Sequence, residues 1–144
     1  MTDAQQFTPR YGANHLQVVE YLYRLGQVTP DQWRARYGGW TTENLASRNR
    51  LADYVSLVAI ERGMVEAFDQ AGRIAWNIAY AAVEPFANAE FDPDFALGYM
   101  RTAASEASLA AQALVMRPMI FPDEFAELYN PMPRAGINPD TLLV

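Results

Sequence analysis

The stretch "GRIAWNIAYAAVEP", residues 72–85, decides the fold of this chain. Its small and aliphatic residues recur every three or four positions, which predicts a helix with a wide apolar arc. Arg73 and Asn77 face away from this arc. We expect other helices to contact it from several sides and at close range, because alanines four positions apart let a neighbouring backbone approach. One such row is formed by Ala71, Ala75, Ala79 and Val83.

The same stretch is not expected to cross a membrane. The most apolar window around it, residues 64–83, carries Glu66, Asp69, Arg73 and Asn77, which are costly in lipid. The first residues, "MTDAQQFTPRYG", lack the basic and apolar regions of a secretion signal. These features favour a cytoplasmic protein with no membrane partner.

The overall composition excludes several kinds of chemistry. The chain has 144 residues, no cysteine and a formal net charge of −6. The lack of cysteine excludes disulfides, thiolate metal sites and cysteine nucleophiles. The negative charge argues against a general binder of nucleic acid or anionic membranes. Every basic residue is an arginine, so lysine nucleophiles and P-loop lysines are also excluded. We therefore predict a protein that is not an enzyme and has no cofactor.

Cap signals divide the chain into helices. Asn14, followed three residues later by Gln17, predicts the start of a helix whose Leu16, Val19 and Tyr23 repeat on one face until Gly26. The run Thr29-Pro30-Asp31 predicts a second, short helix that ends at Gly38-Gly39. Thr41 or Thr42 is expected to open the next one.

A polar stripe at helical spacing then runs from Ser56 to Asn77, through Gly63. It predicts one long helix over residues 42–84, or two helices joined at a bend near Gly63, with Pro85 as the end. Asp92-Pro93-Asp94 predicts a further helix that closes before Pro118. The small face of that helix is expected to pack on the first stretch, at Ala96, Met100, Ala103, Ala107, Ala110 and Leu114.

A last short helix is expected between Pro122 and Asn130, followed by an extended, proline-rich tail over residues 131–144. No run of alternating, β-branched residues indicates a strand. The prediction is an all-α helical bundle with one long central helix and short terminal helices. Residues 1–130 form a single domain, and the tail lies along a groove of this bundle or of a neighbouring subunit.

Two segments resemble a group of uncharacterised helical proteins. "AWNIA", residues 75–79, lies in an alanine-rich helix, and "ALVMRPMIFPDEFAELYNPM", residues 113–132, closes the helical part. The chain resembles proteins of actinobacteria and their phages that have A-W-x-x-A repeats and a closing segment with the pattern ALVxR…F…LY.P. It departs from them in having a single A-W-x-x-A unit. The resemblance implies a small intracellular or phage-encoded helical protein, and no activity.

Few residues suggest a catalytic or metal site. His15 is the only histidine, so sites that need two histidines are excluded. The acidic link around Glu90 and Asp92 has oxygen ligands for Ca²⁺ or Mg²⁺, but it lacks the EF-hand spacing, so we predict no metal. Glu106 is expected on an exposed stripe with Arg101, although a carboxylate on a packed face would have a shifted pKa.

The segment "WRARYGGWTTENLASRNR", residues 33–50, is the most distinctive local feature. It carries four arginines against one acid, Glu43, and interleaves them with three aromatic residues. Arginines and aromatic residues favour protein interfaces, and they also suit stacking and phosphate contacts with single-stranded nucleic acid. A purely structural interpretation, in which arginines pair with acids and tryptophans fill the core, stays open. The candidate interaction residues are Trp33, Arg34, Arg36, Tyr37, Trp40, Arg48 and Arg50.

These observations predict a non-catalytic module for protein–protein interaction or assembly, self-associating or phage-encoded. The alternative is an anion or nucleic-acid binder that uses residues 33–50.

Overall fold

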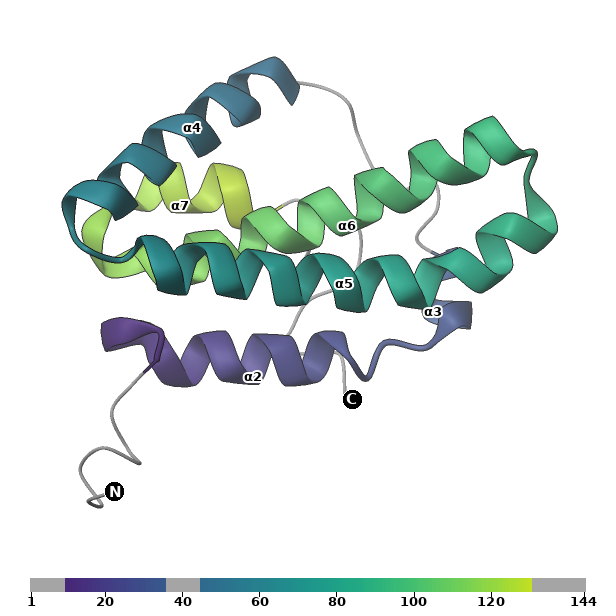
Figure 1. Cartoon of the computed structure of the whole chain (residues 1–144), viewed down its shortest axis with the longest axis horizontal. Helices are drawn as coiled ribbons and strands as arrows, with labels where there is room; N and C mark the ends of the chain where they lie inside the picture. Colours follow the sequence, from purple (N-terminus) through teal and green to yellow (C-terminus); the bar gives the residue numbers. More distant parts are fainter. Residues whose placement is uncertain (1–9, 36–44, 131–144) are drawn as a thin grey trace.

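The protein is an all-α helical bundle (Figure 1), as the sequence predicts. The computed structural model describes residues 10–35 and 45–130, and no strand occurs in these two ranges. Predictions for residues 36–44 and 131–144, including the helix end at Gly38-Gly39, the start at Thr41 or Thr42 and the extended tail, lie outside the described residues. The described helices are η1 (Gly12–Asn14), α2 (His15–Leu25), α3 (Pro30–Ala35), α4 (Leu45–Glu61), α5 (Val65–Glu90), α6 (Pro93–Met116), η3 (Arg117–Met119) and α7 (Pro122–Tyr129).

The centre of the bundle is an antiparallel hairpin of the two longest helices, α5 and α6 (Figure 1). α2 packs against both of them, and α4 and α7 contact each other on the other side of the pair. None of the described helices is long and apolar enough to cross a membrane.

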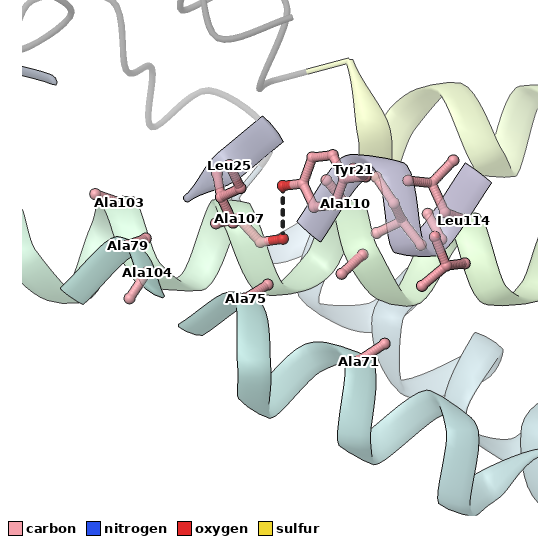
Figure 2. Close-up of a cluster of buried hydrophobic side chains, with 14 of the residues drawn as sticks. Tyr21, Leu25, Ala71, Ala75, Ala79, Ala103, Ala104, Ala107, Ala110 and Leu114 are labelled. Carbon is pink, nitrogen blue, oxygen red and sulfur yellow. Dashed lines mark hydrogen bonds between the residues drawn. The ribbon is translucent and has the colours of Figure 1, made fainter. Parts of the chain in front are cut away.

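Small residues let α5 and α6 approach closely, which confirms the prediction from the first stretch. The expected row on α5 is fully buried, and so is most of the expected face of α6 (Figure 2). Side chains of α6 pack directly on Gly72 of α5, so that an added Cβ would lie 2.5 Å from the Gln112 Nε2 atom and 2.9 Å from the Ser108 hydroxyl oxygen. Alanines bury little area, so larger side chains such as Tyr21, Leu25 and Met116 complete the core.

Gly63 divides the expected long helix into α4 and α5, the second of the two predicted arrangements. Its φ of 71° is left-handed, a conformation that glycine adopts without the steric cost of a Cβ. The Gly63 N–H donates to the Ile60 carbonyl and the Met64 N–H donates to the Ala59 carbonyl, which is a Schellman ending. The polar side chains before and after Gly63 therefore do not lie on one continuous helix face.

The prediction that Pro85 ends the helix was wrong, because α5 continues to Glu90. Pro85 has no backbone N–H to donate to the carbonyl of Ala81, four residues before it. Both residues are exposed to solvent. Packing stabilises the last turns, where Phe86 and Ala87 are buried. The ring of Phe86 lies 5.9 Å from that of Tyr99 on α6.

The helix starts predicted at Asn14, Thr29, Asp92 and Pro122 are confirmed, since α2, α3, α6 and α7 begin there. The Gln32 backbone N–H donates to the Thr29 hydroxyl while the Gln32 side chain accepts from the Thr29 N–H, a reciprocal cap. The Asp92 carboxylate accepts from the Phe95 N–H at the start of α6. Asn14 occupies the N-cap position of α2, but its side chain forms no cap hydrogen bond, and its amide NH2 group donates to the Leu114 carbonyl on α6 at 2.6 Å.

Candidate interaction surface

Three of the candidate residues of segment 33–50 have described side chains, Trp33, Arg48 and Arg50, and they do not share one surface. Trp33 is fully buried, and its carbonyl accepts a hydrogen bond of 2.9 Å from the Tyr99 hydroxyl. Arg48 is also buried, whereas Arg50 is exposed. The prediction that Trp33 and Arg48 offer contacts to a partner is thus corrected, since both lie inside the fold. Arg34 belongs to α3 but its side chain is not described, and Arg36, Tyr37 and Trp40 lie outside the described residues.

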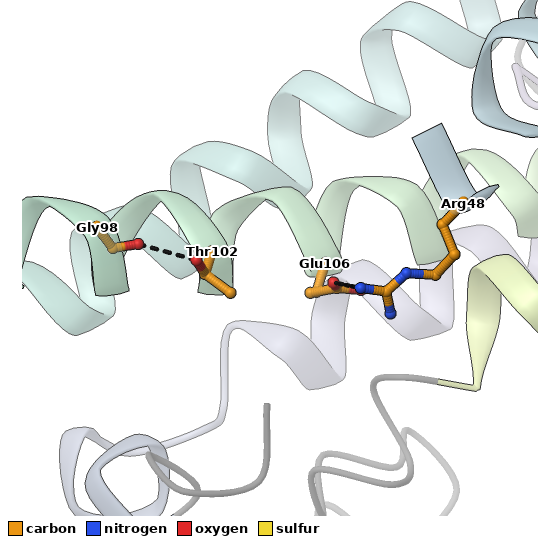
Figure 3. A network of polar contacts seen from close by, with 4 residues as sticks. All are labelled: Arg48, Gly98, Thr102 and Glu106. Carbon is orange, nitrogen blue, oxygen red and sulfur yellow. Dashed lines mark hydrogen bonds and ion pairs between the residues drawn. The ribbon is translucent and has the colours of Figure 1, made fainter. Parts of the chain in front are cut away.

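Arg48 on α4 forms a buried ion pair with Glu106 on α6 (Figure 3). One Nη atom of Arg48 lies 2.8 Å from the Glu106 Oε1 atom, and each side chain is 5% exposed. Glu106 was expected on the exposed stripe of its helix, but α4 covers this part of α6. The pair satisfies the structural interpretation of segment 33–50, in which an arginine binds an acid within the fold.

Burial raises the pKa of Glu106 above its ordinary value, and the Arg48 guanidinium lowers it only in part. The second carboxylate oxygen, Oε2, is buried and has no hydrogen-bond partner in the described part of the chain. Burial also raises the pKa of Tyr21, with Tyr129 and Glu106 adding to the shift. The protonated Tyr21 hydroxyl donates to the Ala107 carbonyl at 2.9 Å (Figure 2). This polar cluster holds α4 and α2 on α6 and is a structural feature.

Helix α2 carries an apolar face that nothing in the described residues covers. Leu16 is 81% exposed, Val19 43% and Tyr23 63%. They occupy positions i, i+3 and i+7, so they form one stripe along the helix. The opposite face, formed by Val18, Tyr21 and Leu25, is buried against α5 and α6. We call Leu16, Val19 and Tyr23 the α2 stripe. A helix that is apolar on two faces is typical of one packed between two partners.

Helix α4 has a second exposed apolar patch, which continues from Arg50. Arg50, Tyr54 and Leu57 lie at i, i+4 and i+7, and Ile60 follows one turn later. Tyr54 is 49% exposed, Leu57 62% and Ile60 56%. Charged side chains, Asp53 and Glu61, are interspersed with them, so this patch is less continuous than the α2 stripe.

Sequence reasoning named Leu16, Val19 and Tyr23 as one face but did not assign them a contact role. The buried residues Val18, Tyr21 and Leu25 have the same i, i+3, i+7 spacing. Periodicity alone therefore cannot decide which face enters the core. The sequence signal is the presence of two apolar faces on one helix, of which only one can be buried against α5 and α6.

A cleft of about 360 Å³ lies beside the α2 stripe, between α2, α6 and α7. Arg24 pairs with Glu20 in its wall, whereas the Arg117 guanidinium donates to the neutral Gln17 side chain and lies 4.3 Å from the Phe125 ring centre. The cleft therefore carries the positive charge of Arg117, and it extends the surface around the stripe.

The remaining candidate groups have structural surroundings. His15 stacks on Tyr11, with 5.5 Å between ring centres, and its Nδ1 atom accepts from the Tyr11 N–H. In residues 10–35 and 45–130, no three histidine, aspartate or glutamate side chains gather closely enough to hold a metal ion. Asp92, in the acidic link, is the cap of α6.

Comparison with known proteins gives no relative: no family model, no curated protein and no solved structure matches the chain. The resemblance to actinobacterial and phage proteins therefore stays a prediction.

Proposed function

We propose that this protein is a non-catalytic module for protein–protein interaction or assembly, and that the α2 stripe is its principal contact surface. The observation that supports this proposal is the exposure of Leu16, Val19 and Tyr23 on a helix whose other face is already buried. Its cytoplasmic location and phage-encoded origin remain proposals from the sequence.

Burying the α2 stripe against a partner is energetically more favourable than leaving it in water. Fully burying a leucine side chain contributes about 1.5–3 kcal/mol relative to leaving it in water. Leu16 lies almost fully in water at 81% exposure, and the large ring of Tyr23 lies two turns further along the same face. Tyrosine is enriched at interface positions that contribute most to binding. A partner that covers the stripe would thus gain most from these two side chains.

The alternative, an anion or nucleic-acid binder that uses residues 33–50, has less support. Of the four arginines in this segment, Arg48 is paired with Glu106 in the interior and does not face a phosphate backbone. Arg50 remains exposed. Binding through arginine–phosphate contacts would weaken steeply as salt rises. A filter-binding titration with single-stranded RNA at two salt concentrations tests this alternative directly.

The experiment for the proposed function is a pull-down with the tagged full chain from a lysate of its source, carried out with and without nuclease. The wild type is compared with Leu16→Glu and Tyr23→Glu. Leu57→Glu, on the α4 patch, is the matched control because it places the same charge at an exposed leucine. Far-UV circular dichroism confirms that each variant is folded.

The proposal predicts that a protein, which is either a second copy or another chain, is retained by the wild type and Leu57→Glu and lost with both α2 variants. Equal retention by all four proteins would refute the α2 stripe as the contact surface. Retention of nucleic acid only, lost on nuclease treatment, would favour the alternative.

A further inference from the structure

We infer that the partner of the α2 stripe is a second copy of this chain, bound antiparallel about a two-fold axis near Val19. This inference rests on the proposed function and adds the identity and geometry of the partner. It is carried by the spacing of the stripe and by the charge around it.

The spacing of the stripe makes it self-complementary. In a two-fold contact, each residue of one copy meets a residue of the other, and the reverse holds as well. An axis between positions 19 and 20 places Leu16 of each copy against Tyr23 of the other, with the two Val19 side chains on one side of the axis and the two Glu20 side chains on the other. The most exposed aliphatic side chain is then covered by the most exposed aromatic side chain of α2.

The charge around the stripe also suits a second copy. Two chains that each carry a net charge of −6 repel one another, so a self-contact needs a surface with little negative charge. Helix α2 carries one acid, Glu20, and one arginine, Arg24, and these two form an ion pair on its edge. Arg117 lies across the neighbouring cleft. Each Glu20 that comes near the axis is therefore paired with Arg24 of its own chain, which limits the repulsion between the two copies.

The α4 patch is less suited to the same contact. Tyr54, Leu57 and Ile60 spread over a wider arc, and Asp53 and Glu61 lie among them. Two copies joined by this patch would bring Asp53 and Glu61 to the contact, and neither carboxylate forms an ion pair within the described residues, unlike Glu20. Like charges at an interface oppose association.

The size of the contact predicts a weak dimer. A standard interface buries about 800 Å² on each partner and involves about 20–30 residues a side. The stripe has three apolar side chains on a helix of 11 residues. We expect reversible association that sedimentation resolves between about 1 µM and about 1 mM protein.

The absence of cysteine from the chain allows a direct geometric test. Helices pack with their axes about 8–10 Å apart, and the Cα atoms lie about 2.3 Å from each axis, so facing Cα atoms at the two-fold are about 5 Å apart. A disulfide spans this distance. Residues seven apart on α2 are separated by about 10 Å along the helix, which is beyond disulfide reach.

The experiment compares single-cysteine variants of the full chain under mild oxidation. Val19→Cys should form a covalent dimer rapidly. Leu16→Cys and Tyr23→Cys should each react slowly alone, and their mixture should cross-link rapidly. Leu57→Cys is the exposed control and should remain slow. A rapid reaction of Leu57→Cys, or of Leu16→Cys alone, would overturn the antiparallel arrangement.

Sedimentation of the cysteine-free chain provides the second measurement. A wild type that dimerises and a Leu16→Glu variant that stays monomeric at about 1 mM would support the inference. A wild type that remains monomeric throughout overturns it. If such a monomer still retains another protein through Leu16 and Tyr23 in the pull-down, the proposed function survives and only the identity of the partner is wrong.

Discussion

Replacing Arg48 by methionine tests how the buried ion pair stabilises the bundle. The change keeps a long apolar side chain but removes the guanidinium that lies 2.8 Å from the Glu106 carboxylate. Removing one partner of a buried pair costs about 3–5 kcal/mol, because the other charge is left in the interior. We expect a loss of this size at pH 8, a large part of the stability of a typical domain.

The loss should depend on pH in a defined direction. Burial raises the pKa of Glu106 in the folded chain, and without Arg48 the pKa rises further. The folded variant then holds a proton that the unfolded chain has released, so its stability falls as pH rises from the ordinary glutamate range through the folded-state pKa. The slope is at most about 1.4 kcal/mol per pH unit. We expect the cost of Arg48→Met to drop below about 2 kcal/mol at pH 5.

The assay is urea unfolding followed by circular dichroism at pH 5, 6, 7 and 8, with the free energy of unfolding extrapolated to water. Arg50→Met is the control on the same helix, and it should change stability by less than about 0.5 kcal/mol because Arg50 is exposed. Adding Glu106→Gln to Arg48→Met should abolish the pH dependence. A cost that is the same at pH 5 and pH 8 would refute the reasoning.

Three further predictions concern the backbone and the core, each measured by thermal or urea unfolding. Gly98→Ala should stabilise the chain by about 0.4–1 kcal/mol, because Gly98 is helical and its added Cβ meets no atom within 4 Å; the same change at the left-handed Gly63 should destabilise by about 1–2 kcal/mol. Equal effects at both sites would argue against the Schellman ending. Tyr21→Phe should cost about 0.5–1.5 kcal/mol through the lost hydrogen bond to Ala107, and an unchanged midpoint would count against that bond. Pro85→Ala should raise stability by up to about 3 kcal/mol, since it restores a backbone donor inside α5, whereas a loss would show that the proline is needed there.

The central hairpin could be predicted from the sequence because its signals are local and agree with one another. Alanines four apart on α5 face small residues on α6, and the cap at Asp92 fixes where α6 begins. The sequence left open whether a bend near Gly63 divides the long helix, and the left-handed backbone of Gly63 shows that it does. The failure at Pro85 has a physical cause: tertiary packing of Phe86 outweighed a local breaker signal.

The candidate surface was harder to predict, because burial depends on which elements meet in space. Val18 and Val19 are neighbours in the sequence, yet one is fully buried and the other is 43% exposed. Likewise Arg48 and Arg50 belong to one basic segment, and only the distant Glu106 on α6 decides that the first enters the interior. No local pattern contains this pairing across 58 positions of sequence (106 minus 48).

The most direct test of the central claim is sedimentation equilibrium of the wild type beside Leu16→Glu and Leu57→Glu, from about 1 µM to about 1 mM protein. The account predicts that the wild type and Leu57→Glu associate with the same concentration dependence, and that Leu16→Glu, still folded by circular dichroism, remains monomeric. A wild type whose association is unchanged by Leu16→Glu would contradict the assignment of the α2 stripe as the contact surface.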